Sequence, residues 1–344
     1  MPAPRALPGL AGGGLAPGGS IPGRTDQPQA DRFLRDVLAG LSSRPRSLPS
    51  VYFYDAQGSE IFKRIMALEQ YYPTRCEQEI LETHGEEVVA PFLRRRSTLV
   101  DLGAGDGAKT RLLLSRLHRR CPDLTYAPVD VSCSALAESS ARMSAAFPGL
   151  SVEPVAAEYA EGLAWLGRRE GSGSLLVLFL GSNIGNLERA GAHRLLGELR
   201  AALRPGDHVL VGFDLLKDLD VLRGAYDDGL GVTAAFNLNL LARMNRELGA
   251  DFDLGAFAHR ATFDPERPAM ESWLESQRDQ VATVGGARFA FQARERIHTE
   301  ISCKYRESDV TEFARSAGFA EVGRFRDRRG WFLDALWRVP GRVR

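Results

Sequence analysis

Between residues 98 and 215, short apolar runs alternate regularly with helix-like stretches, and this rhythm leaves few folds open to the chain. The run LLVLFLGS at 175–182 is apolar at nearly every position, as expected of a strand buried on both faces of a sheet. The other apolar runs lie at 98–105, 126–132, 150–158 and 208–215. Strands that alternate with helices predict a parallel, doubly wound α/β sheet with helices on both faces.

The sequence after this alternation predicts two further features. Residues 217–300 contain one helix-like stretch, FNLNLLARMNRELG, and then short strand candidates, which together indicate an inserted lobe. Two stretches near the C-terminus, EVGRFRDRRG and WFLDALWRV, alternate apolar and polar residues. This alternation predicts a β-hairpin, so we expect a mainly parallel sheet that ends in an antiparallel hairpin.

The N-terminal region has a different composition. Residues 1–24 are rich in proline and glycine and predict a disordered tail. Helix-like spacing of apolar residues begins near Asp31, recurs over 59–68, and resumes over 77–89 after the loop YYPTR. These segments precede the first apolar run and leave enough chain to form a lid over a ligand.

Charge and cysteine content exclude several classes of protein. Lys+Arg and Asp+Glu both total 44, so no excess of charge favours nucleic acid or an anionic membrane as partner. The four cysteines form no CxxC pair, which argues against a metal site and a disulfide framework. No apolar run approaches the roughly 18 residues of a membrane helix, and the N-terminus lacks the features of a secretory signal. We expect a cytoplasmic monomer that acts on a small molecule.

A glycine-rich loop lies where the first strand of the alternation meets its helix. Its sequence, DLGAGDG, begins at Asp101 and contains Gly103 and Gly105. Glycines at such a turn let the backbone approach a ligand closely, and ligands of open α/β sheets bind at the carboxyl ends of the strands. Asp130 ends the next strand, where a carboxylate can accept hydrogen bonds from both hydroxyls of a ribose. A tight turn with no ligand is the alternative interpretation.

The loop alone does not identify the cofactor. The spacing of Gly103, Gly105 and Ala108 also fits the relaxed fingerprint of nicotinamide-dinucleotide enzymes. Asp106 stands at the start of the helix, where it would repel a pyrophosphate. S-adenosylmethionine has no pyrophosphate, so the loop favours methyl transfer over hydride transfer.

Four other segments concentrate polar and aromatic residues. They are the tyrosines of FYD and YYPTR, the turn GSNIGN after the fourth strand, YDD at 226–228, and TEISCK at 299–304. Each has an ordinary structural interpretation as packing residues, a turn or a solvated strand face. Glu300 and Ser302 are two residues apart and would share one face of a strand.

Together these segments resemble the histidine Nα-methyltransferases of ergothioneine biosynthesis. The shared motifs stand in this sequence as FYD, YYPTR, LGAGDGAKT, FLGSNIGN, AYDD and TEISCK. The resemblance extends from about residue 34 to about residue 340, and YYPTR and FLGSNIGN are its most specific motifs. It implies a Rossmann-like class I methyltransferase sheet with a C-terminal antiparallel hairpin and a second, substrate-binding lobe.

The resemblance also implies which residues bind the cofactor, S-adenosyl-L-methionine. Gly103, Lys109 and Asp130 would contact it, and Tyr54 would lie close to both the cofactor and the reacting amine. Glu158 and Tyr159 occupy the positions of an Asp-Phe pair that contacts the adenine in the family. Glu keeps the negative charge of Asp on a longer arm, so we expect cofactor binding to be retained.

The acceptor implied by the resemblance is L-histidine. Tyr71 and Asn186 would hold its amino and carboxylate end, with Tyr54, Tyr71 and Asn186 closest to the chemistry. Tyr226 and the backbone at Gly181 would help to bind the carboxylate. Glu300 and Ser302 would bind the two imidazole nitrogens, one of which donates while the other accepts. Ser272 replaces a methionine that packs on the imidazole in some relatives.

These observations predict an enzyme that trimethylates the α-amino group of L-histidine to hercynine, the first step of ergothioneine biosynthesis. The alternatives are the same chemistry on tryptophan or a modified histidine, a nicotinamide-dependent oxidoreductase, and a non-catalytic binding protein. The cofactor domain is expected over 76–216 and 301–344, and the substrate-binding lobe over 25–75 and 217–300.

Overall fold

The computed structural model describes residues 26–168 and 173–341. The predicted tail, residues 1–24, lies outside the described residues. The chain divides into two compact units. The first unit comprises Pro73–Leu216 with 303–341, and the second comprises 26–72 with Lys217–Ser302.

The first unit contains an eight-stranded sheet in the order β13-β14-β7-β6-β2-β3-β4, with β5 also paired to β3. Strands β2 to β7 run parallel, whereas β14 is antiparallel to both β7 and β13. The strands are β2 Arg96–Leu102, β3 Asp123–Asp130, β4 Ser151–Val152, β5 Val155–Ala156, β6 Ser174–Phe179, β7 His208–Asp214, β13 Ala320–Arg326 and β14 Phe332–Arg338. The doubly wound sheet and its C-terminal hairpin are therefore confirmed.

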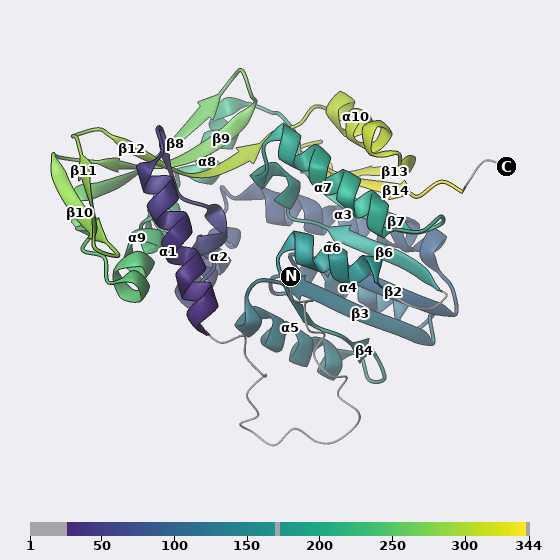
Figure 1. The fold of residues 1–344 in the computed structure, drawn as a ribbon. Coiled ribbons are helices and arrows are strands. Elements are labelled where there is room, and N and C mark those ends of the chain that lie inside the picture. Colours follow the sequence, from purple (N-terminus) through teal and green to yellow (C-terminus); the bar gives the residue numbers. More distant parts are fainter. Residues whose placement is uncertain (1–25, 169–172, 342–344) are drawn as a thin grey trace. The chain divides into compact units, whose positions relative to one another are not determined.

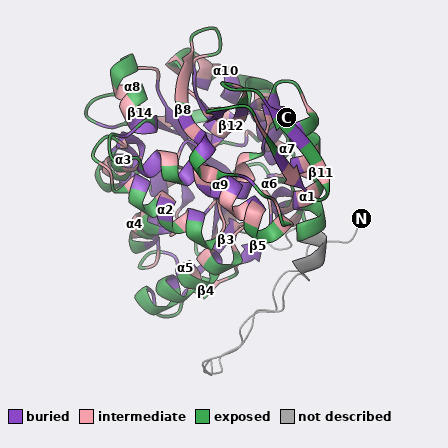
Figure 2. Cartoon of the chain, turned by 90° about the vertical axis from the view of Figure 1, so that its left-hand side faces the viewer, coloured by how far each residue is buried: buried purple, intermediate pink, exposed green. Residues whose placement is uncertain are grey.

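Helices cover both faces of this sheet (Figure 1). The apolar sides of α6, α7 and α10 pack on one face, in a single core with residues of β2, β6, β7 and β14. Figure 2 shows the largely exposed outer side of α5. The helices of this unit are α3 Tyr72–Val89, η2 Ala90–Phe92, α4 Ala108–Leu117, α5 Cys133–Ala146, α6 Tyr159–Gly167, η3 Asn183–Asn186, α7 Arg189–Ala202 and α10 Glu307–Ala317.

The strand predicted to be buried on both faces forms for the reason its sequence indicates. In β6, Leu175 to Phe179 are all fully buried, because helices cover both faces of the strand. The helix expected from residue 77 begins earlier, at Tyr72. Pro73 is tolerated there because the first turn of a helix leaves its backbone N–H groups without intrahelical partners.

The second unit combines a four-stranded sheet, β1-β12-β9-β8, with the hairpin β10-β11. Its core contains Phe53, Phe236 and Leu240. Its strands are β1 Arg46–Ser47, β8 Phe257–Asp264, β9 Ala269–Ser276, β10 Gln280–Val284, β11 Ala287–Phe291 and β12 Arg296–Cys303. Its helices are α1 Asp26–Ser42, η1 Ser50–Phe53, α2 Ala56–Met66, α8 Leu219–Tyr226, α9 Val232–Leu248 and η4 Leu254–Ala256. Among the described residues, no helix is long and apolar enough to cross a bilayer.

Candidate active site

The loop after β2 is built from glycines in a conformation that other residues rarely adopt. Gly103, Gly105 and Gly107 have φ angles of 78°, 54° and 69°, in the left-handed region that favours glycine. The Gly103 N–H donates to the Val129 carbonyl at 2.8 Å. This bond ties the loop to β3 and brings bare backbone to the carboxyl ends of two neighbouring strands.

The surroundings of two of these glycines differ. A Cβ at Gly103 would lie 2.7 Å from Nδ2 of Asn183 and 3.1 Å from Oη of Tyr159. A Cβ at Gly105 would meet no atom within 4 Å. The loop therefore packs against Asn183 and Tyr159 at one glycine and faces open space at the other, where a ligand can approach the backbone.

Asp130 ends β3 and stabilises the glycine loop. Its Oδ2 accepts from the Gly105 N–H at 3.0 Å, and its Oδ1 accepts from the Ser132 N–H at 2.9 Å. Each carboxylate oxygen can accept two hydrogen bonds, so each keeps capacity for one more donor. The side chain is half-buried and remains accessible to a hydroxyl group.

The start of α4 already carries a negative charge. Asp106 Oδ1 accepts from the Ala108 N–H at 3.0 Å and so occupies the positive end of the helix dipole. A pyrophosphate placed there would meet this carboxylate, so the local electrostatics disfavour a dinucleotide.

Glu158 and Tyr159 lie at the start of α6. Glu158 caps this helix in a reciprocal arrangement with Glu161. Tyr159 packs edge-on against Phe179, with ring centroids 5.2 Å apart. Burial, together with the nearby Asp130 and Asp101, raises the pKa of the Tyr159 phenol, which therefore stays neutral. It is a hydrogen-bonding group beside Gly103.

The GSNIGN turn follows β6 in a strained backbone conformation. Gly181 and Ser182 have φ angles of 74° and 56°, and Ser182 is one of two non-glycine residues at positive φ among the described residues. The turn leads into η3, at whose end Asn186 lies half-buried. The Gly181 N–H donates to the Glu77 carboxylate, so another residue already uses this donor.

Lys109 belongs to the same region of the first unit. Its ammonium forms an ion pair with Glu77 and would lie 3.3 Å from a Cβ at Gly181. The structure thus brings together Gly103, Asp130 and Tyr159 at the carboxyl ends of β2 and β3, and Lys109 with Gly181 after β6.

In the second unit, Tyr54 and Tyr71 pack on the same aromatic ring. Their ring centroids lie 5.6 Å and 6.1 Å from that of Phe62, both in edge-on geometry. Tyr54 also packs on Phe236. Tyr54 precedes α2 in the sequence and Tyr71 follows it. Phe62, which belongs to α2, therefore brings these two predicted site residues into one aromatic cluster.

Three further predicted residues of the second unit lie close in the fold. The hydroxyls of Tyr226, at the end of α8, and Ser302, on β12, are hydrogen-bonded at 2.7 Å. Glu300 is half-buried and lies two residues before Ser302, on the same face of the strand. On β9, the replacement residue Ser272 is fully buried, and the Trp273 ring lies 4.7 Å from that of His298.

Sequence reasoning missed four residues that support these groups. His259 Nε2 donates to the Tyr226 carbonyl at 2.9 Å. Asp101 accepts hydrogen bonds from Thr110 and Tyr126 beneath the glycine loop. Asn183 lies beside Gly103. Burial raises the pKa of Asp101 to about 6. Glu77 is the fourth. The available signal for Asp101 and Asn183 was their place in the motifs DLGAGDG and GSNIGN, and no comparable motif marked Glu77 and His259.

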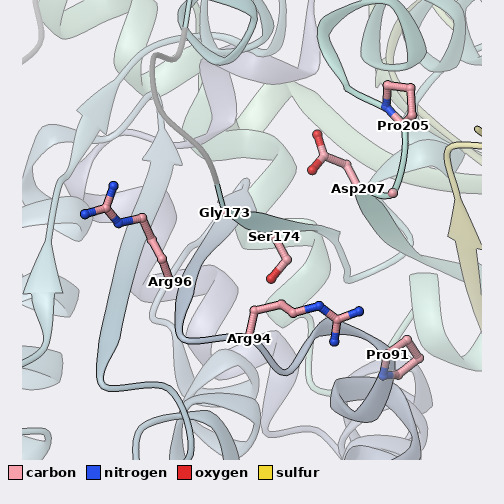
Figure 3. Close-up of a pocket in the computed structure, with 8 residues that line it drawn as sticks. Pro91, Arg94, Arg96, Gly173, Ser174, Pro205 and Asp207 are labelled. Carbon is pink, nitrogen blue, oxygen red and sulfur yellow. The ribbon is translucent and has the colours of Figure 1, made fainter.

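A surface pocket of the first unit lies away from these residues. Arg94 and Arg96 line it near the amino ends of the parallel strands, opposite the ligand-binding edge. The two arginines extend in different directions and do not converge on one point (Figure 3). The other lining residues are Pro91, Gly173, Ser174, Pro205, Gly206 and Asp207.

Comparison with known proteins identifies the family. A family model described as a histidine-specific, SAM-dependent methyltransferase matches residues 33–339. Histidine N-alpha-methyltransferase of Mycolicibacterium smegmatis is 41% identical over 305 residues, covering 88% of this chain and 94% of that protein. The protein of the same name from Mycobacterium tuberculosis is 41% identical over 300 residues, covering 87% and 92%. Ergothioneine biosynthesis protein 1 of Neurospora crassa is 30% identical over 282 residues, covering 81% of this chain and 32% of that protein.

The glycine loop fits the cofactor of this family. Open space at Gly105, the remaining acceptor capacity of Asp130, and the carboxylate of Asp106 at the helix start suit a nucleoside without a pyrophosphate. The family match identifies this cofactor as S-adenosylmethionine. This chain belongs to the family of histidine-specific, S-adenosylmethionine-dependent methyltransferases.

Proposed function

We propose that this enzyme trimethylates the α-amino group of L-histidine to give hercynine, the first step of ergothioneine biosynthesis. The observation that carries this proposal is the family match over residues 33–339. The names of the relatives, histidine N-alpha-methyltransferase and ergothioneine biosynthesis protein 1, support the acceptor and the pathway.

The proposed cofactor residues have distinct tasks. Asp130 would accept hydrogen bonds from the ribose hydroxyls while it holds the Gly105 backbone. Glu158 and Tyr159 would bind the adenine end, and the loop backbone at Gly103 would contact the cofactor. Lys109 and Tyr54 complete the proposed set. Bound S-adenosylmethionine supplies an electrophilic methyl group on a sulfonium.

The proposed acceptor residues divide between the two ends of histidine. Tyr71, Asn186 and Tyr226, with the backbone at Gly181, would hold the amino and carboxylate end. Because the Gly181 N–H donates to Glu77, any contribution of Gly181 to the acceptor would come from its shape rather than this donor. Glu300 and Ser302 would bind the imidazole nitrogens, and such a site strongly disfavours side chains that leave its polar groups unpaired.

The chemistry requires a free amine lone pair and correct orientation, with little covalent catalysis. Tyr71 and Asn186 are neutral, so they can orient the amine without a strong charge-assisted bond. The amine can then turn between successive transfers. Tyr71 or water would accept the proton that the amine releases, and Tyr54 would line the site of reaction.

We also propose that the enzyme works as a cytoplasmic monomer. The large apolar side chains that are exposed in the described part of the chain lie on separate segments of the sequence, at Leu219, Leu230, Val281 and Val322. None of the four cysteines, all of which lie within the described ranges, forms a disulfide, as is usual in a reducing compartment.

Mass spectrometry tests the proposed reaction. The purified enzyme is incubated with S-adenosylmethionine and an equimolar mixture of the common amino acids. We expect histidine to gain up to three methyl groups while the others stay unchanged. Methylation of tryptophan in preference to histidine would overturn the proposal.

A further inference from the structure

Three ionisable side chains from separate elements meet inside the first unit. Glu77 comes from α3, Lys109 from α4 and Asp334 from β14. Glu77 and Asp334 are fully buried. Lys109 is ion-paired with Glu77, and Asp334 lies next to both, so that its charge acts on each of them. Burying several charges is costly unless they are paired, which makes this cluster unusual for a sheet interior.

The fold makes room for this cluster at a glycine. Gly212 lies in the middle of β7 and is paired in register with Asp334 on β14. A Cβ at residue 212 would overlap Oε1 of Glu77. The missing side chain therefore lets Glu77 reach the sheet beside Asp334.

Glu77 holds the turn that follows β6. Its two oxygens lie 2.8 Å and 2.9 Å from the Gly181 nitrogen, which donates to them. Gly181 and Ser182 adopt left-handed backbone angles and lead into η3. Glu77 therefore stabilises a turn that places Asn183 beside Gly103 and ends at Asn186.

The charges in the cluster determine its protonation. Burial raises the pKa of Asp334 well above its ordinary value, and the negative charge of Glu77 acts in the same direction, against Lys109. Burial alone would lower the pKa of Lys109, but Glu77, Asp334 and Asp101 together raise it. Both oxygens of Asp334 are buried and have no hydrogen-bond partner among the described residues, which, like its raised pKa, favours the protonated acid. The neighbouring carboxylates favour the charged form of Lys109.

We propose that Glu77 is a positioning residue for methyl transfer, and that Lys109 and the buried Asp334 hold its carboxylate under the Gly181–Asn186 turn. This role rests on the proposed function, because Asn186 is a proposed acceptor contact. The protonation of Asp334 does not depend on that function and can be measured separately.

Infrared difference spectroscopy tests the proton on Asp334. We expect the wild-type spectrum at neutral pH to contain the carbonyl band of a protonated carboxylic acid that D334N lacks. Asp101 contributes to both spectra and cancels. If no acid band disappears in folded D334N, the proposed proton is absent and the arrangement is overturned, whatever the acceptor.

Kinetics test the positioning role. E82Q is the matched control, because Glu82 is an exposed carboxylate on the same helix. We expect E77Q to lower kcat by up to about 100-fold, because a small misplacement near a reaction can have an effect of this size. Its affinity for S-adenosylhomocysteine should change by less than about threefold, which is well below the 1.4 kcal/mol of a tenfold change. E77Q kinetics equal to those of E82Q would contradict the role.

The pH dependence of turnover in D334N tests the proposal even if E77Q does not fold. Ionisation of Asp334 in the wild type would place two negative carboxylates together, so turnover should decline at alkaline pH. The amide introduced in D334N cannot ionise and can donate to Glu77, so this variant should keep its turnover there. An alkaline decline that is the same in both proteins would contradict the proposal.

Discussion

At the scale of single residues, the structure shows side chains that stabilise a backbone turn and still have capacity to bind a ligand. Asp130 is the clearest example, because each of its oxygens accepts one backbone N–H. In the second unit, one hydrogen bond between Tyr226 and Ser302 fixes both of their hydroxyls. Their residue types were visible in the sequence, whereas their partners were not.

Asp130→Ala should weaken cofactor binding. The change removes the acceptor proposed for the ribose hydroxyls and releases the Gly105 N–H. We expect calorimetry to show affinity for S-adenosylhomocysteine at least roughly tenfold lower, the value of one charge-assisted partner. Asp123→Ala, at the exposed start of the same strand, is the control. Equal affinities for the two variants would show that Asp130 does not bind the nucleoside.

Glu300→Ala should change the choice of acceptor. If the carboxylate binds imidazole, its loss should lower kcat/KM for histidine by roughly two to three orders of magnitude, as for other sites that bind a polar group. Activity on tryptophan should stay constant or rise, because the variant no longer discriminates in favour of an imidazole. Parallel losses on both substrates, with normal cofactor affinity, would count against histidine as the acceptor.

At the scale of elements, short connections place the proposed site residues. The turn from β6 into η3 carries Gly181 at one end and Asn186 at the other. In the second unit, α8 ends at Tyr226, whose carbonyl is held by His259 of β8. These contacts fix the ends of elements, where small displacements would move a functional group.

Asn186→Ala should affect turnover far more than stability. Asn186 lies half-buried at the end of η3, where its side chain makes no hydrogen bond to another described residue. We expect a severe loss of kcat with the thermal midpoint nearly unchanged. A large fall in the midpoint would identify Asn186 as a structural turn residue instead.

His259 should make the protein less stable in acid. Its Nε2 must carry the proton given to the Tyr226 carbonyl, and its buried Nδ1 has no partner among the described residues. Burial lowers the pKa of His259. The folded state therefore resists protonation, and its contribution to stability is full above the unfolded pKa of about 6.5 and is lost as the pH falls towards the lower folded pKa.

Urea unfolding as a function of pH measures this effect. His259→Gln keeps a donor near the Nε2 position but cannot take up a proton. Its free energy of unfolding should fall less steeply below about pH 6.5, by up to about 1.4 kcal/mol per pH unit for one proton. Burial also lowers the pKa of His208, which remains in both proteins and does not affect the comparison. Identical slopes would contradict the assignment.

At the scale of the whole molecule, local sequence patterns predicted the fold, whereas the contacts behind the candidate site join residues that are far apart in the sequence. Apolar runs indicated the strands of the parallel sheet, and the alternation of apolar and polar residues near the C-terminus indicated the hairpin. Gly212 and Asp334 were hidden within the runs HVLVGFDL and WFLDALWRV, because the meaning of each depends on Glu77, far away in the sequence. The early start of α3 was missed because a loop and a first helical turn containing Pro73 look alike in sequence.

The central claim is that methyl groups are transferred to the α-nitrogen of histidine, and nuclear magnetic resonance of the product tests it most directly. The enzyme is supplied with histidine and S-adenosylmethionine carrying a carbon-13-labelled methyl group. We predict a single labelled signal from equivalent methyl groups, coupled through nitrogen to the α-carbon. Labelled methyl groups on the imidazole ring, or unmodified histidine in the presence of a cofactor-binding enzyme, would contradict the account.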